Sequence, residues 1–189
     1  MPFDARTVEA AYRQGIFPMA EGRAVKWYRP KRRAILPLEN FHASRSLRAL
    51  IKRHPFEITF DQDFAAVMDA CADRPETWIS AEFKSVYGEL HSQGKAHSVE
   101  IRVEGELAGG VYGVHLGGAF FAESMFHRRT NMSKVALAEL VARLKDRGFA
   151  LLEVQYLTEH LAQFGVIEVP DSEYQARLKS ALDLRCEFP

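Results

Sequence analysis

The chain has 189 residues, of which 47% are hydrophobic, and its 25 Lys and Arg residues balance 25 Asp and Glu residues. No apolar run approaches the ~20 residues that a membrane-spanning helix needs, and Asp4 and Glu9 occupy the region where a secretory signal would be apolar, so we expect a cytoplasmic protein without membrane contact. The two cysteines, Cys71 and Cys186, are far apart and lack neighbours with metal-ligand spacing, which argues against a disulfide framework and against a metal site.

The first part of the chain, residues 1–54, is predicted to form a small basic domain. Its expected elements are a helix from Asp4 to Gly15, short strands at 27–28 and 34–36 bounded by Pro30 and Pro37, and a helix from Ser44 to Arg53.

Charge divides the chain unevenly, since residues 1–53 hold 12 Lys and Arg against 4 acids, and 54–189 hold 13 against 21. The basic segment from Arg23 to Arg53 also contains Trp27, Tyr28 and Phe41. Such a surface suits phosphate backbones and unpaired bases, and an acidic surface suits a cationic partner. The alternative is that the basic segment docks on the acidic remainder of the same chain.

The second part, residues 55–189, is predicted to form an α+β domain with a mixed sheet. Its expected elements are a strand at 56–60, a helix capped by Asp61 and ending at 72, a helix capped by Ser80 and ending at Gly94, strands at 97–103, 106–114 and 119–125, a helix opened by Ser133 and closed by Gly148, a strand at 149–156, a short helix at 160–164, a strand at 166–169 and a helix at 171–184.

Glu123 stands in the apolar run 120–126, at the end of an expected strand, and a basic, hydroxyl-rich turn at 127–134 follows it. An unpaired carboxylate in apolar surroundings is costly, so such a residue usually has a partner or a task. Pairing with Arg128, Arg129 or Lys134, or exposure on a strand face, is the alternative. The segment resembles the Gly-Glu-Ser-Met-Phe … Asn-x-Ser-Lys signature of the bacterial leucyl/phenylalanyl-tRNA–protein transferases, which move an amino acid from tRNA onto a protein amino terminus.

Further blocks carry the same resemblance in the expected order. They are Tyr-x-x-Gly-x-Phe-Pro at 12–18, Trp-Tyr-Arg-Pro at 27–30, Arg-Ala-Ile-Leu at 33–36, His-Ala-Ser-Arg-Ser-Leu at 42–47, Thr-Trp-Ile at 77–79, His-Ser-Val-Glu at 97–100, Gly-Gly-Val-Tyr-Gly-Val at 109–114, and Glu-Val-Gln at 153–155 with His160-Leu161 and Phe164-Gly165. The resemblance implies a GNAT-like acyltransferase core, no cofactor, and transfer of Leu or Phe, with Met as a further donor, from aminoacyl-tRNA to proteins that begin with Arg or Lys, as in the N-degron pathway.

The resemblance also implies a catalytic group. Gln155 would position the incoming amine, Glu153 would polarise it, and Glu123 would bind the acceptor or act electrostatically. Residues two apart on a strand share a face, so Glu153 and Gln155 are expected to point into one cleft. The family has Asp where this chain has Glu153, and the extra methylene can misplace a catalytic group.

Substrate-binding positions follow from the same resemblance. The donor pocket would include Val111, Phe120 and Met125, with Val111 in place of a larger Met, although apolar residues on alternate strand positions are also ordinary core. The remaining substrate-binding residues would be Trp27, Trp78, Tyr87 and Ser133, with Trp78 and Tyr87 near the adenosine. The tRNA-binding residues would be Lys26, Arg29, Lys31, Arg32, Arg33 and Arg45.

Two other functions remain open from the sequence. An acyl-CoA N-acetyltransferase on the same fold would hold its cofactor pyrophosphate with a glycine-rich turn, and the turn at 127–133 has no glycine. A relative that binds aminoacyl-tRNA or protein amino termini without catalysing transfer is the second alternative, and the presence of Gln155 and Glu123 argues against it.

Overall fold

We describe the fold from a computed structural model, which places residues 2–22, 24–53 and 55–189. Arg23, part of the expected basic segment, and residue 54, where the domain boundary is predicted, lie outside the described residues. The elements are α1 (Ala5–Tyr12), β1 (Phe17–Glu21), β2 (Ala24–Tyr28), β3 (Arg32–Ile35), η1 (Leu38–Asn40), α2 (Arg45–Arg53), β4 (Glu57–Phe60), α3 (Phe64–Ala72), α4 (Ala81–Ser92), β5 (Ala96–Val103), β6 (Glu106–Leu116), β7 (Ala119–His127), α5 (Met132–Asp146), β8 (Leu151–Glu153), α6 (Glu159–Ala162), β9 (Ile167–Pro170) and α7 (Asp171–Leu182).

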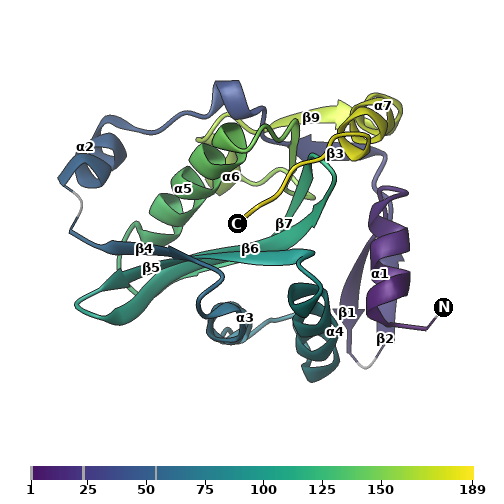
Figure 1. Cartoon of the computed structure of the whole chain (residues 1–189), viewed down its shortest axis with the longest axis horizontal. Helices are drawn as coiled ribbons and strands as arrows, with labels where there is room; N and C mark the ends of the chain where they lie inside the picture. Colours follow the sequence, from purple (N-terminus) through teal and green to yellow (C-terminus); the bar gives the residue numbers. More distant parts are fainter. Residues whose placement is uncertain (1, 23, 54) are drawn as a thin grey trace.

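A seven-stranded sheet forms the centre of the molecule, in the order β4-β5-β6-β7-β8-β3-β9, and β1 pairs only with β2 in a separate hairpin (Figure 1). Neighbouring strands of the large sheet are antiparallel except for β7 and β8, which are parallel. A mixed sheet packed with helices is an α+β arrangement, so the predicted fold class is confirmed.

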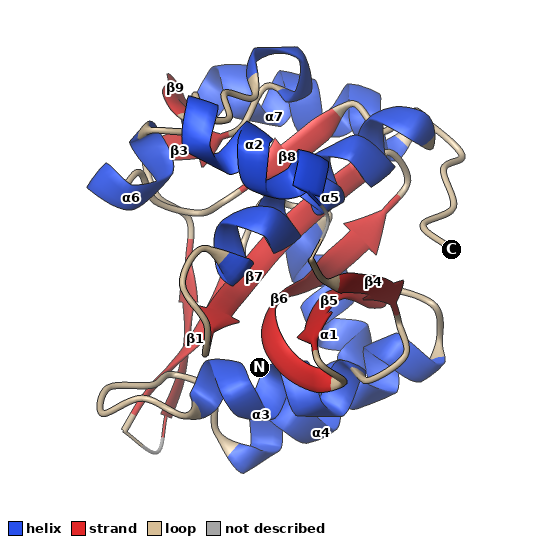
Figure 2. Cartoon of the chain, turned by 90° about the vertical axis from the view of Figure 1, so that its left-hand side faces the viewer, coloured by secondary structure: helices blue, strands red, loops and turns tan. Residues whose placement is uncertain are grey.

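Helices cover both faces of this sheet: α5 lies on one face, and α3 and α4 lie on the other (Figures 1 and 2). Successive side chains of a strand point to opposite faces of the sheet. Because helices cover both faces, the central strands must be apolar at consecutive positions. Phe120 accordingly packs in the core under α5, whereas Phe121 packs in the core against α1 and α4.

Polar caps fix several helix starts where the sequence predicts them. The backbone N–H of Thr7 donates to Asp4 at 2.7 Å, and Ser44 and Ser80 accept in the same way from Leu47 and Phe83. Each cap satisfies a backbone donor that the first helical turn leaves unpaired, so these predicted boundaries are confirmed.

Several predicted boundaries are wrong: α1 ends at Tyr12 instead of Gly15, β2 begins at Ala24 instead of residue 27, and β1 was not expected. Helix α3 begins at Phe64, because Asp61 adopts a left-handed conformation with φ 58° and its carboxylate accepts from the Ser98 N–H at 2.9 Å instead of capping the helix. The strand expected at 149–156 is only Leu151–Glu153, since the chain turns away at Gln155, where φ is 65°.

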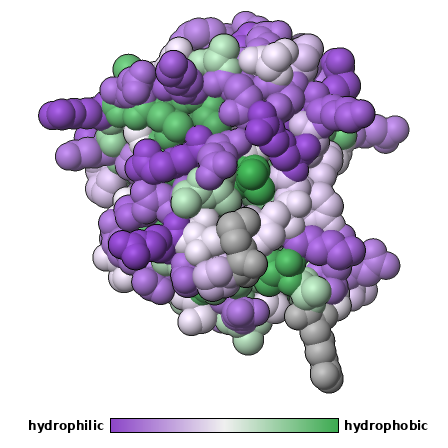
Figure 3. All heavy atoms as spheres, turned by 90° about the vertical axis from the view of Figure 1, so that its right-hand side faces the viewer, coloured by the Kyte–Doolittle hydropathy of each residue, from purple (hydrophilic) through white to green (hydrophobic). Residues whose placement is uncertain are grey.

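Strand β3 comes from the basic first part of the chain, yet it lies in the large sheet between β8 and β9. The sheet is therefore shared across the boundary predicted at residue 54. Of the remaining early elements, α2 lies on one side of the molecule, and α1 and the β1–β2 hairpin stand at the opposite end, which carries α7 (Figure 1). Figure 3 shows that the face on this side is largely hydrophilic, with smaller hydrophobic areas between the polar ones.

Candidate active site

A cavity opens where β7 and β8 separate. The two strands pair from Ala119 to Phe121 of β7, and no described strand pairs with the rest of β7 on that side. The cavity has a volume of about 320 Å³. Its lining residues are Arg74, Trp78, Val111, Ala122, Glu123, Ser124, Met125, Leu137, Val154, Thr158 and Leu161.

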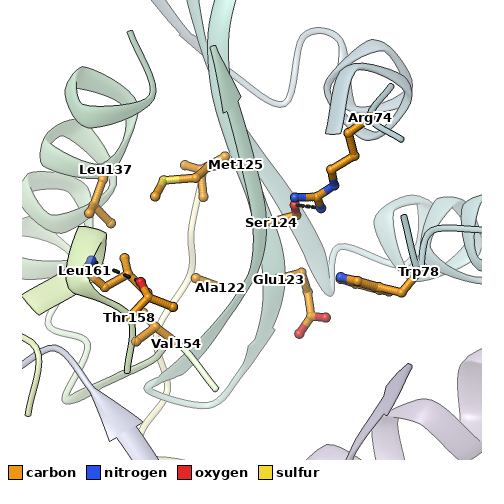
Figure 4. Close-up of a pocket in the computed structure, with 11 residues that line it drawn as sticks. Arg74, Trp78, Ala122, Glu123, Ser124, Met125, Leu137, Val154, Thr158 and Leu161 are labelled. Carbon is orange, nitrogen blue, oxygen red and sulfur yellow. Dashed lines mark hydrogen bonds between the residues drawn. The ribbon is translucent and has the colours of Figure 1, made fainter. Parts of the chain in front are cut away.

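Strand β7 divides this lining into an apolar and a polar side (Figure 4). Met125, Leu137 and Leu161 lie on one side of the ribbon, and Glu123 and Trp78 lie on the other. The site can therefore hold an apolar group beside a carboxylate, which is the combination that Glu123 suggested in the sequence.

Glu123 is 7% exposed and accepts three hydrogen bonds. Its Oε1 accepts from the Tyr12 hydroxyl at 2.5 Å, and its Oε2 accepts from the Gln155 amide at 3.1 Å and the Tyr87 hydroxyl at 3.4 Å. The two tyrosine hydroxyls lie 2.7 Å apart. Burial raises the pKa of Glu123 to about 8, although the hydrogen bond from Tyr12 opposes the rise. The carboxyl group is thus poised to exchange a proton near neutral pH.

Glu153 has no exposed surface, and its carboxylate binds the backbone of Gln155. Its Oε1 accepts from the Gln155 backbone N–H at 3.0 Å and from Arg33 Nη2 at 2.9 Å. Burial raises the pKa of Glu153, and the charge of Arg33 opposes this. The expectation that Glu153 and Gln155 share a strand face is wrong because Gln155 lies past the end of β8 in a left-handed conformation. Of these two residues, Gln155 is the one whose side chain donates to Glu123.

Arg33 is the counter-ion at this site and is 1% exposed. Its guanidinium lies 4.0 Å from the ring centre of Tyr174 and 5.4 Å from that of Phe17, and Nη1 donates to the Gly15 carbonyl. Gly15 has φ 71°, and a Cβ there would approach Gln175 Nε2 to 2.5 Å. The prediction that Arg33 binds tRNA phosphate is therefore wrong for this conformation, because the side chain has no surface to offer.

The amino-terminal motif at 12–18 thus has a structural explanation. Tyr12 donates to Glu123, the Gly15 carbonyl accepts from Arg33, and the Phe17 ring packs on Arg33. Tyr12 and Arg33 belong to motifs of the sequence, but the motifs did not indicate that these two side chains bind the carboxylates. Only the fold brings residues 12, 33, 123 and 153 together.

The predicted substrate-binding residues are divided between the cavity and the core. Trp78, Val111 and Met125 line the cavity. The other four do not: Phe120 stacks on Phe188, Tyr87 reaches Glu123 only through its hydroxyl, Trp27 packs against Phe3, and Ser133 lies 3.3 Å from His127 Nδ1. Sequence reasoning assigned no place in the wall to Arg74, Leu137, Val154, Thr158 and Leu161, although Val154 and Leu161 stand in two of the motif blocks.

Most of the predicted tRNA-binding cations in the first strands are paired with acids. Lys26 pairs with Glu21, Arg29 with Asp171 at 2.7 Å, and Arg32 with Glu168 at 3.1 Å. Lys31 and Arg45 are exposed and form no salt bridge among the described residues. The alternative that the basic segment docks on the acidic remainder of the chain thus holds for Arg29 and Arg32.

Within the described ranges, no group of three His, Cys, Asp or Glu side chains has an arrangement suited to a metal ion. No helix of the same ranges is both long and apolar enough to cross a membrane.

Comparison with known proteins identifies relatives over nearly the whole sequence. A profile described as leucyl/phenylalanyl-tRNA protein transferase matches residues 35–179, and a profile of the N-terminal domain of the same proteins matches residues 1–31. The leucyl/phenylalanyl-tRNA–protein transferase of Roseobacter denitrificans is 56% identical over 90% of this chain and 83% of its own. That of Gloeobacter violaceus is 52% identical over 94% of this chain and 93% of its own.

Solved structures give weaker matches. A ribosomal-protein-alanine N-acetyltransferase from Brucella melitensis biovar Abortus 2308 aligns with a TM-score of 0.40 at 16% identity, over 56% of this chain and 85% of its own. L-PGS from Bacillus licheniformis aligns with a TM-score of 0.44 at 15% identity, over 83% of this chain and 55% of its own. These similarities carry no argument about function, and the sequence relationship decides the assignment: the chain belongs to the leucyl/phenylalanyl-tRNA–protein transferase family.

Proposed function

We propose that this transferase moves Leu or Phe, with Met as a further donor, from aminoacyl-tRNA to the amino terminus of proteins that begin with Arg or Lys, as in the N-degron pathway. The observation that carries the proposal is the meeting of an apolar wall and a buried carboxylate network in one cavity. Aminoacyl transfer needs both, because the donor side chain is apolar and the acceptor is a cation.

The apolar wall supports the choice of donor. Val111, Met125, Leu137 and Leu161 offer carbon surface without hydrogen-bond partners for a side chain placed among them. A polar amino acid would lose its hydration there without replacement, whereas Leu, Phe or Met would gain from burial. The resemblance implies a larger Met at the position of Val111, and the smaller side chain found here should leave room for bulky donors.

Glu123 and Gln155 support an amine acceptor. Gln155 donates through Nε2 to Glu123, so its carbonyl oxygen is left to accept a hydrogen bond from an incoming α-amine. The α-ammonium of a protein has a pKa of about 7.7, close to the value of about 8 to which burial raises the pKa of Glu123. Proton transfer between the two groups is then nearly balanced, and the negative form of Glu123 attracts a cationic first residue.

The proposed reaction forms one bond and breaks one. The ammonium releases a proton to Glu123, the free amine nitrogen attacks the ester carbonyl carbon, and the C–O bond to the tRNA ribose breaks. The nitrogen then loses a second proton, and the leaving ribose oxygen gains one. Gln155 orients the nucleophile, and Glu153 with Arg33 holds the Gln155 backbone in place.

Helix α2 supports tRNA binding. Arg45, Arg48, Lys52 and Arg53 are exposed and form no salt bridge to any described acid. Arg45, Arg48 and Lys52 follow helical spacing, so they share one face that can follow a phosphate backbone.

The direct test is to incubate the protein with leucyl- or phenylalanyl-tRNA and a peptide that begins with Arg, and to measure the peptide mass. We expect the addition of one Leu or Phe residue. Gln155→Ala should lower single-turnover rates about 10²-fold or more while the affinity for charged tRNA stays nearly unchanged, since Gln155 acts on the transition state.

Gln93→Ala, which changes an exposed glutamine after α4, is the matched control and should transfer at the wild-type rate. An unmodified peptide in the presence of demonstrated charged-tRNA binding would contradict the proposed transfer. Full activity of Gln155→Ala would contradict the role assigned to that residue.

A further inference from the structure

A second cavity adjoins the donor cavity along β7. It has a volume of about 400 Å³, and its lining residues are Ala70, Cys71, Asp73, Arg74, Met125, Phe126, His127 and Arg128. Arg74 and Met125 line both cavities, so the two cavities are adjacent. In Figure 4, Arg74 reaches toward Ser124 from the same side of the strand as Trp78.

The guanidinium groups of Arg74 and Arg128 are held in place without being neutralised. Arg74 Nη2 donates to the Ser124 hydroxyl at 2.8 Å. Arg128 Nη1 donates to the Leu107 carbonyl at 3.5 Å, and the Arg128 guanidinium lies 5.7 Å from the ring centre of Phe126. Neither forms a salt bridge with an acid in the described ranges, although Asp73 lines the same cavity.

Arg129, the next residue, shows the contrast. Its guanidinium pairs with Glu104 at 2.6 Å and does not line the second cavity. Two adjacent arginines of one turn therefore have different roles: Arg129 is paired with an acid, and Arg128 keeps free donors beside a cavity. Guanidinium groups with free N–H donors bind phosphate oxygens in bidentate geometry.

We propose that the second cavity binds the phosphodiester that precedes the terminal adenosine of the donor RNA. This assignment rests on the proposed function. With the amino acid in the first cavity and the adenosine beside Trp78, the next group along the single strand is a phosphodiester, and Arg74 lines both spaces. Arg74 and Arg128 then bind the phosphate oxygens, and His127 adds a third donor at the exposed rim.

The first experiment measures equilibrium binding and requires no transfer. The probes are adenosine and the dinucleotide CpA, which differ by one cytidine and one phosphodiester. CpA should bind the wild-type protein about tenfold more tightly than adenosine, as expected for charge-assisted hydrogen bonds. Arg128→Gln should abolish that advantage, whereas the control variant Arg129→Gln should keep it.

The second experiment compares transfer from phenylalanyl-adenosine and phenylalanyl-CpA. Arg128→Gln should raise KM for phenylalanyl-CpA about tenfold and leave KM for phenylalanyl-adenosine unchanged. If neither donor supports transfer but the binding preference for CpA depends on Arg128, the proposed function fails and the phosphate site stands.

Three results would overturn the site. The first is equal binding of CpA and adenosine by the wild-type protein. The second is an equal loss of CpA affinity in Arg128→Gln and Arg129→Gln. The third is a combination of two observations in Arg128→Gln: an unchanged preference for CpA, and a raised KM for an acceptor peptide that carries an acidic second residue. This combination would assign the cavity to the acceptor protein.

Discussion

The cations of residues 26–33 and those of helix α2 have the same sign and opposite surroundings. Lys26, Arg29, Arg32 and Arg33 each pair with an acid of this chain, whereas no cation of α2 forms a salt bridge to a described residue. Figure 1 places α2 at the far side of the molecule from the β1–β2 hairpin. A run of positive charge in a sequence therefore combines two populations, one that stabilises the fold and one that remains available to a partner.

The position of a cation in the fold determines whether it lies near an acid of the same chain. Strand β3 pairs antiparallel with β9, so Arg32 lies opposite Pro170 and near Glu168, and β3 also adjoins β8, which carries Glu153. Helix α2 packs its single buried residue, Leu47, toward the core and presents its cations outward. The comparison predicts different consequences for substitutions in the two segments.

Loss of Arg33 should have the largest effect. Arg33→Met leaves the Glu153 carboxylate buried without its counter-ion, which should lower the free energy of unfolding by about 3–5 kcal/mol. Urea denaturation measures this value. Arg32→Met, which breaks an exposed pair with Glu168, is the matched control and should cost no more than about 1 kcal/mol.

A double variant separates the effect of losing Arg33 on stability from its effect on catalysis. Arg33→Met combined with Glu153→Gln removes the unpaired charge and should recover much of the lost stability. Turnover should remain low, because Arg33 no longer orients the residue that holds the Gln155 backbone. Equal stability of Arg33→Met and Arg32→Met would remove the distinction between buried and exposed pairs.

The sequence predicted those features that depend on local patterns. Asp4, Ser44 and Ser80 were identified as caps because a cap satisfies donors only three residues away. The place of β3 in the sheet and the burial of Arg33 were not predicted, because both depend on pairing with residues about 120 to 140 positions later. Glu123, Gln155 and Glu153 were identified by family resemblance, which could not reveal the turn at Gln155.

Neutralising α2 should have the next largest effect. Changing Arg45, Arg48 and Lys52 together to Gln should weaken tRNA binding about 10²-fold near 0.1 M salt and reduce the slope of log affinity against log salt by about 2. Filter binding or fluorescence titration over a salt series measures both. The matched triple variant of Lys26, Arg29 and Arg32 to Gln should change affinity only about threefold or less, since these cations are already paired with acids.

A larger loss of tRNA affinity in the strand triple variant than in the α2 triple variant would reverse the comparison. It would mean that the acids of residues 21, 168 and 171 release their cations to RNA. Lys31 is exposed and without a salt bridge to a described residue, so it should be kept unchanged in both variants.

A third prediction concerns Glu123, a buried acid whose contacts are hydroxyls and an amide rather than a cation. Burial raises its pKa to about 8 from an ordinary value of 4.5, so the folded protein holds a proton that the unfolded chain releases. The contribution of this group to stability is therefore present below pH 4.5 and is lost as the pH rises through about 8. Burial also raises the pKa of Glu153, but there the charge of the neighbouring Arg33 opposes the rise.

Glu123→Gln should consequently stabilise the protein more at pH 8.5 than at pH 5, by about 2 kcal/mol or more. The hydrogen bonds that the amide cannot accept are lost at both pH values, so this loss cancels in the comparison between them. Urea denaturation of both proteins at the two pH values measures the difference. The same gain at pH 5 and pH 8.5 would show that Glu123 does not titrate between them.

The smallest expected effect tests exposed pairing directly. Arg29 and Asp171 lie 2.7 Å apart, with side chains 48% and 23% exposed, so solvent and salt weaken their attraction. Arg29→Gln should lower the free energy of unfolding by less than about 1 kcal/mol at low salt, and the loss should vanish near 1 M salt. The loss in Arg33→Met should persist at both salt concentrations, because the Arg33–Glu153 pair is sealed from solvent. A salt-independent loss in Arg29→Gln would mean that residue 29 stabilises the fold through packing of its aliphatic chain, and that charge does not hold Arg29 to Asp171 of the acidic remainder.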